Sequence, residues 1–380
     1  MKRFRHVFFT LISVIVIIYI VFLFFPTRQE VLSGSSFSEQ IPSTLQIVPN
    51  RLQNSPSNAS FSEAIGIPAH SLTKRRSTQD VMQDIDSIAE ETEGALVYQW
   101  FLELQNLLEE HGHVAYEIYT RISQLDSDTV SSRRKLSLLY GVLAQSTSAE
   151  ALKILHKSVA DDQSEYHMIQ AIAALGDVPN PDAQTAQVLW DQSQRHADPL
   201  VRSTALLALG SVAHRGVDES QLIRENLLAL SQNKLELAQE GVLIAAMGNH
   251  GDSEYWPYLQ RQGQSVDEAI RASALYSSRS LPQEEVNQWI TEVAVSDQSL
   301  YVKNEALKVL AIRSSRFDVS RAISKIALSK HDPELHMHAT NLLISLASDY
   351  RDSSQESLTQ VYEDTPFANV KDIIRQTPLN

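Results

Sequence analysis

Two stretches of the sequence, HADPLVRSTALLALGSVA at 196–213 and KHDPELHMHATNLLISLA at 330–347, align without a gap. The Asp-Pro pair at 198–199 matches the pair at 332–333, and three later positions hold the same alanine or leucine. Asp caps the free N–H groups of a helix start, and Pro at the first helical position lacks a donor that would be orphaned there. Each stretch therefore predicts a helix that begins at this pair.

A small residue at the position of Ala205 recurs along the chain. The steps between successive occurrences are 34, 34, 36, 33, 32 and 33 residues, at Ser137, Ala171, Ala205, Gly241, Ala274, Ala306 and Ala339. From about residue 81 onward, apolar residues recur at spacings of three and four, and strand-like alternation is absent. Each unit is long enough for two helices of about 11–15 residues and their turns.

A repeat of 32–36 residues that is purely helical indicates an α-solenoid. A single helical hairpin exposes its apolar stripe, and the next hairpin covers it by stacking against it. We therefore predict an all-α fold, a right-handed α-solenoid of about seven helical hairpins over residues 81–375. We expect the small residue to lie at the tightest contact, where two helix backbones approach.

The run DPLVRSTALLALG at 198–210 resembles the second-helix signature of HEAT repeats. The segments LYGVLAQSTSAEAL (139–152) and ALLALGSVAHRG (205–216) are also similar to the helical domain of vitellogenin-type large lipid-transfer proteins. The HEAT resemblance implies a scaffold that binds proteins along a curved surface. The vitellogenin resemblance implies a lipid- or hydrophobe-binding helical module, which stays open as an alternative.

An apolar run, VFFTLISVIVIIYIVFLFF at 7–25, precedes the helical region. At 1.5 Å per residue it would span about 28 Å, close to the roughly 30 Å hydrocarbon core of a bilayer. Lys2, Arg3 and Arg5 precede it, so the positive-inside rule makes residues 1–6 a cytoplasmic stub. We predict a single anchor in the lipid bilayer of the inner membrane, with the bulk of the chain in the periplasm. A cleaved signal peptide is the alternative, but its apolar core is shorter, about 7–15 residues.

Residues 26–80 are rich in Ser, Pro, Gln and Asn and hold no lasting helical or strand period. Such a stretch buries too little apolar surface to offset its ordering entropy, so we expect a flexible linker. Residues 81–380 carry 24 basic and 42 acidic residues, a net charge of −18. This charge repels phosphate backbones, which predicts no nucleic-acid binding, and it favours protein partners with basic patches.

The sequence offers no recognised catalytic or metal-binding motif. It has no cysteine, which excludes disulfides and thiolate zinc sites, and it has no P-loop, nucleophile-elbow or zinc-protease motif. His336 and His338 point about 200° apart on a helix, and His331 is five residues from His336, so neither pair is placed to share an ion. We therefore predict no metal, no cofactor and no catalytic residue, in a chain that is not an enzyme.

Aromatic residues supply the candidate contact surface. Trp190, Trp256 and Trp289 lie 66 and 33 residues apart, in step with the repeat, and each falls in the first helix of its unit. A repeated core position explains this spacing, and a row of aromatics that anchors a partner is the alternative. Tyr255, Trp256 and Tyr258 form the densest cluster and are the predicted contact patch. The function predicted is a membrane-anchored, extracytoplasmic scaffold that binds a protein partner and is not catalytic, and an enzyme is the second alternative after the lipid-binding module.

Overall fold

The structure is a computed structural model of the 380-residue chain, and it describes residues 76–161, 164–329 and 332–377. The chain divides into two units, Met1–Ser77 and Thr78–Asn380, and the described helices belong to the second. The predicted stub, the predicted membrane anchor at 7–25 and nearly all of the predicted linker lie outside the described residues. Among the described helices, none has the length and apolar character that a membrane crossing needs.

The described residues form 18 α-helices and two short 3-10 helices, η2 (Ser253–Tyr255) and η3 (Ser278–Ser280), and no strand. The odd-numbered helices are α3 (Thr78–Asp86), α5 (Val114–Ile122), α7 (Ala149–Ala160), α9 (Ala183–Arg195), α11 (Ser220–Leu230), α13 (Trp256–Gln262), α15 (Glu285–Ser296), α17 (Ser320–Ala327) and α19 (Arg351–Asp364). The even-numbered helices are α4 (Gly94–Glu110), α6 (Val130–Gln145), α8 (Glu165–Asp177), α10 (Pro199–His214), α12 (Leu237–His250), α14 (Glu268–Ser277), α16 (Leu300–Arg313), α18 (Pro333–Leu346) and α20 (Ala368–Gln376).

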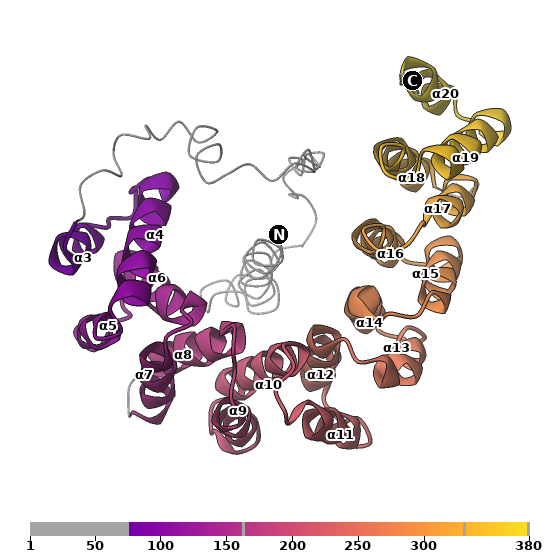
Figure 1. Cartoon of the computed structure of the whole chain (residues 1–380). Helices are drawn as coiled ribbons and strands as arrows, with labels where there is room; N and C mark the ends of the chain where they lie inside the picture. Colours follow the sequence, from indigo (N-terminus) through magenta and orange to yellow (C-terminus); the bar gives the residue numbers. More distant parts are fainter. Residues whose placement is uncertain (1–75, 162–163, 330–331, 378–380) are drawn as a thin grey trace, which may run out of the picture. The chain divides into compact units, whose positions relative to one another are not determined.

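Within Thr78–Asn380 the helices alternate between two rows (Figure 1). Each even helix packs against the next one, from α4 against α6 through to α16 against α18, and the even row lies on the inner side of the curve. The odd helices form the outer row. Each one carries the chain back to the edge where the next even helix begins, so the even helices all run in the same direction. The all-helical, solenoid-like fold predicted from the repeat is confirmed. The pairs α3–α4 and α19–α20 flank the seven units that the sequence marked.

The predicted helix starts are confirmed in detail. The side chain of Asp198 accepts hydrogen bonds from the backbone N–H of Leu200 at 2.6 Å and of Val201 at 3.1 Å. Asp332 caps α18 in the same way. Asp267 caps α14 without a following proline, because the carboxylate alone satisfies the orphaned N–H groups of a first turn.

The repeat position is the seventh residue of each even helix. Five of the marked alanines occupy it in α8, α10, α14, α16 and α18, and all five are fully buried. In α6 and α12 the seventh residue is Leu136 or Leu243, both buried. The sequence analysis chose the neighbouring small residues Ser137, which is exposed, and Gly241, which is half-buried. Small residues are frequent in these helices, so residue size alone assigned the repeat position to the wrong residue in two of the seven units.

Neighbouring even helices approach closely at glycines near their C-terminal ends, five residues beyond the marked position in α8 and α10. A Cβ added to Gly176 of α8 would lie 2.7 Å from an alanine Cβ of α10. On Gly210 of α10 it would overlap the backbone oxygen of Ala246 in α12, and on Gly248 of α12 it would lie 2.5 Å from a serine Cβ of α14. Only a residue without a side chain allows these backbones to meet. These glycines therefore mark close backbone contacts between even helices, in addition to the buried alanines of the repeat position.

Polar side chains close the C-terminal ends of the even row. Arg215, which follows α10, donates to the carbonyl oxygen of Gly176 at the end of α8. The Tyr350 hydroxyl donates to the carbonyl oxygen of Ser314, the residue that follows α16, at 2.7 Å. The last turn of a helix leaves carbonyl oxygens without intrahelical partners. Side chains of the following unit donate hydrogen bonds to some of these oxygens.

Gly210→Ala should lower the free energy of unfolding by about 1–3 kcal/mol, because the added methyl group forces the α10 and α12 backbones apart. Thermal and urea denaturation of the full-length chain measure the change.

Gly241→Ala in α12 is the matched control. Its added Cβ would meet only Ile270 Cδ1, at 4.0 Å, so the better helix propensity of Ala should raise stability by up to about 1 kcal/mol. If Gly210→Ala proved as stable as the wild type, the close glycine contact would not hold the even row together.

Candidate functional site

The structure places the three residues of the predicted contact patch differently. Tyr255 and Tyr258 are 0% and 5% exposed and belong to the core. Trp256 is half-buried and packs edge-on against Trp289, with ring centres 5.1 Å apart and planes at 80°. Trp190 lies in α9, Trp256 in α13 and Trp289 in α15, so the three tryptophans fall in first helices, as predicted. Partner contact at this patch stays a prediction, and Trp256 is the member of the patch with an accessible ring.

Tyr255 belongs to a buried polar chain that sequence spacing did not reveal. His250 Nδ1 lies 2.7 Å from the Tyr255 hydroxyl, and His250 Nε2 lies 3.0 Å from Ser220 Oγ. Burial lowers the pKa of His250 to about 4, so the ring is neutral at neutral pH. Ser220 Oγ donates to the carbonyl of Ala213 at 3.2 Å, so it accepts from His250 Nε2–H, and Tyr255 donates to Nδ1.

This direction of hydrogen bonding gives the chain a structural role. In an activated serine nucleophile the histidine accepts the serine proton, whereas here the histidine donates to the serine. Ser220 begins α11, His250 ends α12, and Tyr255 precedes α13, so the relay joins the α10–α11 turn to the α12–α13 turn.

The histidines considered as metal ligands lie apart. His336 is buried, and its Nε2 lies 2.9 Å from Thr365 Oγ1, while His338 is exposed, 3.4 Å from Asn304 Oδ1. His331 lies outside the described residues. In the part of the chain that the structure describes, no three His, Cys, Asp or Glu side chains are grouped to hold a metal ion.

Exposed apolar side chains gather along one edge of the helical unit. Ten large apolar side chains are exposed among the described residues, and six of them lie at or beside the N-terminus of an even helix. We call these six the apolar edge: Leu96, Val130, Leu237, Val266, Leu300 and Tyr301. Val266, directly before the N-cap of α14, is fully exposed.

Hydrogen bonds and ion pairs join neighbouring N-termini along this edge. Arg271 of α14 binds Asp297, which precedes α16, through Nε at 2.8 Å and Nη2 at 3.0 Å. Ser299, the N-cap of α16, donates to Glu268 at 2.5 Å. The first turns of successive even helices therefore lie side by side, and their exposed residues share one side of the array.

The loops that lead from an odd helix into the next even helix are acidic. Their described residues include eleven Asp and Glu, and Lys234 is the single Lys or Arg. Several of these acids cap a helix, as Asp198 and Asp267 do, and the positive end of the helix dipole stabilises them. Capping does not account for the apolar residues, since the exposed Val266 packs against nothing as a hydrophobic staple would. The edge thus combines apolar groups with a negative field.

The sequence from residue 74 to residue 369 matches the vitellogenin TPR domain, which covers more than half of the chain. The chain belongs to the vitellogenin TPR domain family. The match includes all the even helices from α4 to α18, and with them the glycine contacts and the apolar edge. No curated protein sequence matches this family member.

Several solved structures have a helical array similar to that of this chain. The complex of CpcE and CpcF of phycocyanin lyase from Nostoc is 16% identical, with a TM-score of 0.41, over 66% of this chain and 94% of that chain. YibA of Escherichia coli is 13% identical, with a TM-score of 0.40, over 76% and 100%. Human deoxyhypusine hydroxylase in complex with glycerol is 17% identical, with a TM-score of 0.28, over 76% and 97%. At these identities the likeness concerns the helical fold alone.

The prediction that the chain is not an enzyme is wrong as an inference from its fold. It rested on a purely helical repeat and on missing motifs, yet a lyase and a hydroxylase are among the proteins with similar helical arrays.

Acid should destabilise the fold through His250. Its pKa is about 4 in the folded chain and about 6.5 when unfolded, so the unfolded chain takes up this proton first as the pH falls. The stability that depends on neutral His250 is complete above about pH 6.5 and is lost as the pH falls toward 4. Between pH 7 and pH 5, the wild type should lose about 2 kcal/mol more than a His250→Gln variant.

Urea denaturation at the two pH values measures the two losses. The comparison uses the difference between pH values within each protein, so a lower absolute stability of the variant does not affect it. Equal losses in both proteins would show that His250 is not held neutral by the fold.

Proposed function

We propose that this chain is a helical-repeat scaffold that binds a protein partner along the apolar edge. The observation that carries the proposal is the placement of exposed apolar side chains at the N-terminal ends of five even helices, α4, α6, α12, α14 and α16. Single exposed apolar residues are ordinary on a protein surface, but six of them along one edge favour an interaction surface. Helical-repeat proteins bind along surfaces to which each unit contributes an equivalent position.

The acidic loops beside the apolar edge indicate the chemistry of the partner. A segment that alternates apolar residues with Lys or Arg would cover the aliphatic side chains and neutralise the capping carboxylates. Surface charge of this kind speeds association and is screened by salt, so binding should weaken as the ionic strength rises. The lipid-binding alternative has less support, because charged residues and hydroxyl groups outnumber apolar residues in the lining of two grooves of the described helices.

We also propose that residues 7–25 anchor the scaffold in the inner membrane and that residues 26–80 link it to the helical unit on the periplasmic side. The length and apolar character of 7–25 and the basic residues before it support this proposal.

Cell fractionation tests the anchor. The full-length chain should sediment with membranes, resist extraction by high salt or carbonate, and be released by detergent. A soluble form shorter by roughly 25–35 residues would instead identify a cleaved signal peptide.

Site-specific photo-crosslinking in cells tests the proposed partner surface. A photoreactive amino acid at Leu237 or Val266 should give a discrete, heavier adduct on illumination of the cells, and a weaker one when the cells are opened at high salt before illumination. Leu222 is the matched control, because it is exposed to 55%, against 58% for Leu237, but it lies on α11 in the outer row. Adducts of equal strength at Leu222, or none at Leu237 and Val266, would contradict the proposal.

A further inference from the structure

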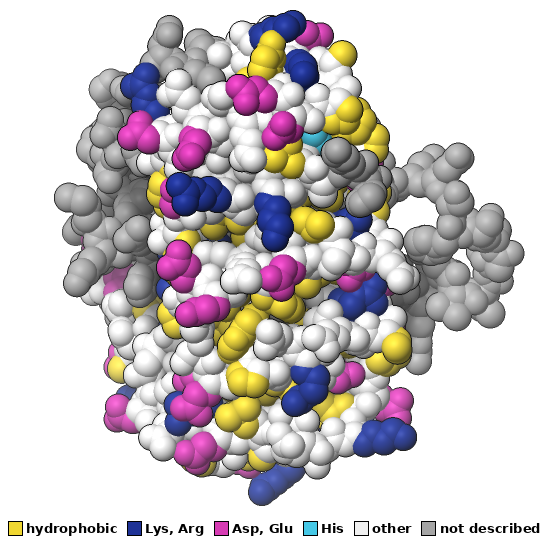
Figure 2. All heavy atoms as spheres, turned by 90° about the vertical axis from the view of Figure 1, so that its right-hand side faces the viewer, with side chains coloured by type: hydrophobic (Ala, Val, Ile, Leu, Met, Phe, Trp, Pro, Cys, Tyr) yellow, Lys and Arg dark blue, Asp and Glu magenta, His cyan; other side chains and the backbone are white. Residues whose placement is uncertain are grey.

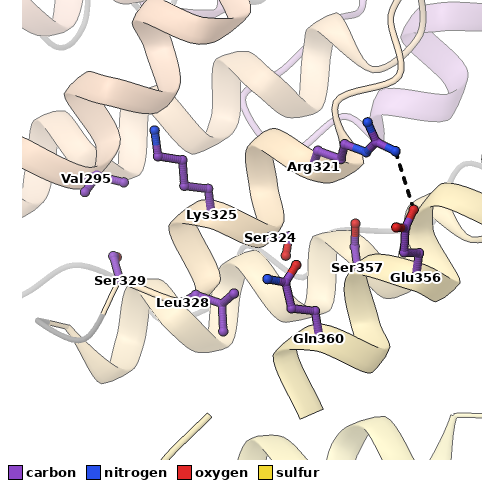
Figure 3. A pocket seen from close by; sticks show the side chains of 9 residues that line it. All are labelled: Val295, Arg321, Ser324, Lys325, Leu328, Ser329, Glu356, Ser357 and Gln360. Carbon is purple, nitrogen blue, oxygen red and sulfur yellow. Dashed lines mark ion pairs between the residues drawn. The ribbon is translucent and has the colours of Figure 1, made fainter. Parts of the chain in front are cut away.

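The outer row holds a groove that none of the sequence patterns indicated. On the side formed by helices such as α15, α17 and α19, acidic and basic side chains are intermixed, with apolar strips between them (Figure 2). Here α15, α17 and α19 border an open groove of about 460 Å³ (Figure 3). This volume lies within the range of about 300–1,000 Å³ that is usual for ligand pockets.

The charge of the groove is opposite to that of the helical region as a whole. Residues 81–380 carry a net charge of −18, yet the groove presents the cations Arg321 and Lys325 against the single anion Glu356. Arg321 pairs with Glu356 at 3.6 Å, with both side chains mostly exposed, at 85% and 72%. Such an exposed pair is weak, so Arg321 can exchange this partner for a ligand. No described acidic side chain lies within ion-pair distance of Lys325.

The floor of the groove holds an unused hydrogen-bonding group. Ser324 is only 3% exposed, and its hydroxyl has no hydrogen-bond partner among the described residues. A buried hydroxyl without a partner is unfavourable, so a ligand oxygen that accepts from it would relieve this cost. Ser357 and Gln360 of α19 line the opposite wall, and Val295 and Leu328 give the groove an apolar side (Figure 3).

We propose that this groove binds an acidic peptide segment. The carboxylate of an Asp or Glu would lie against the Lys325 ammonium group and accept a hydrogen bond from the Ser324 hydroxyl. A neighbouring apolar side chain of the peptide would pack against Leu328 and Val295. This groove lies in the outer row, apart from the apolar edge, so either site can fail its test while the other stands.

Selection of random decapeptides displayed on phage, with the full-length chain immobilised in detergent, tests the proposal. Peptides that bind the wild type and fail to bind Lys325→Glu should be enriched in Asp or Glu beside an apolar residue. Lys308→Glu, an equal charge change on α16 in the inner row, should leave their binding unchanged.

Fluorescence anisotropy with a selected peptide then measures the individual contacts. Lys325→Glu should weaken binding at least tenfold, and Ser324→Ala should weaken it about threefold while the melting temperature stays the same or rises. Replacing the peptide's Asp or Glu with Asn or Gln should have an effect similar to Lys325→Glu.

Two results would overturn the proposal. One is a selection with no peptides that depend on Lys325, or with such peptides enriched in Lys or Arg. The other is displacement of the selected peptide by millimolar inorganic phosphate, which would identify a site for small anions and not for a peptide.

Discussion

The close approach of neighbouring even helices at Gly176, Gly210 and Gly248 is the constraint on which the rest of the structure depends. At each glycine the backbone of one even helix meets the next helix with no side chain between them. The packing is most extensive where these contacts lie, between α8 and α10 and between α10 and α12. Each hairpin has an apolar stripe that only its neighbour can cover, so the array is stable as a whole and not unit by unit.

Parallel even helices also determine what the surface can offer. All their N-termini meet at one edge, where capping carboxylates collect because each first turn needs acceptors for its free N–H groups. The same edge carries the exposed apolar side chains, which capping does not require. The opposite ends are closed by side chains such as Arg215 and Tyr350, which satisfy carbonyls of the preceding unit. Both edges thus carry bonds between units, and the N-terminal edge also presents exposed apolar side chains that a partner can cover.

Features that depend on neighbours in the sequence could be predicted, and features that depend on packing could not. The Asp-Pro pairs and the period of the repeat located the helix starts and the all-helical fold. Residue size misplaced the repeat position at Ser137 and Gly241, because burial decides that position. The Ser220–His250 contact and the groove around Ser324 join helices that are about 30 residues apart in sequence. Their side chains have no shared motif, so nothing in the sequence pointed to them.

Hydrogen–deuterium exchange of the full-length chain tests the central claim most directly. If the glycine contacts hold the array together, backbone amides in α8, α10 and α12 should exchange slowest, and amides in the terminal helices α3 and α20 should exchange fastest. Exchange in α8, α10 and α12 that is as fast as in α3 and α20 would contradict the account.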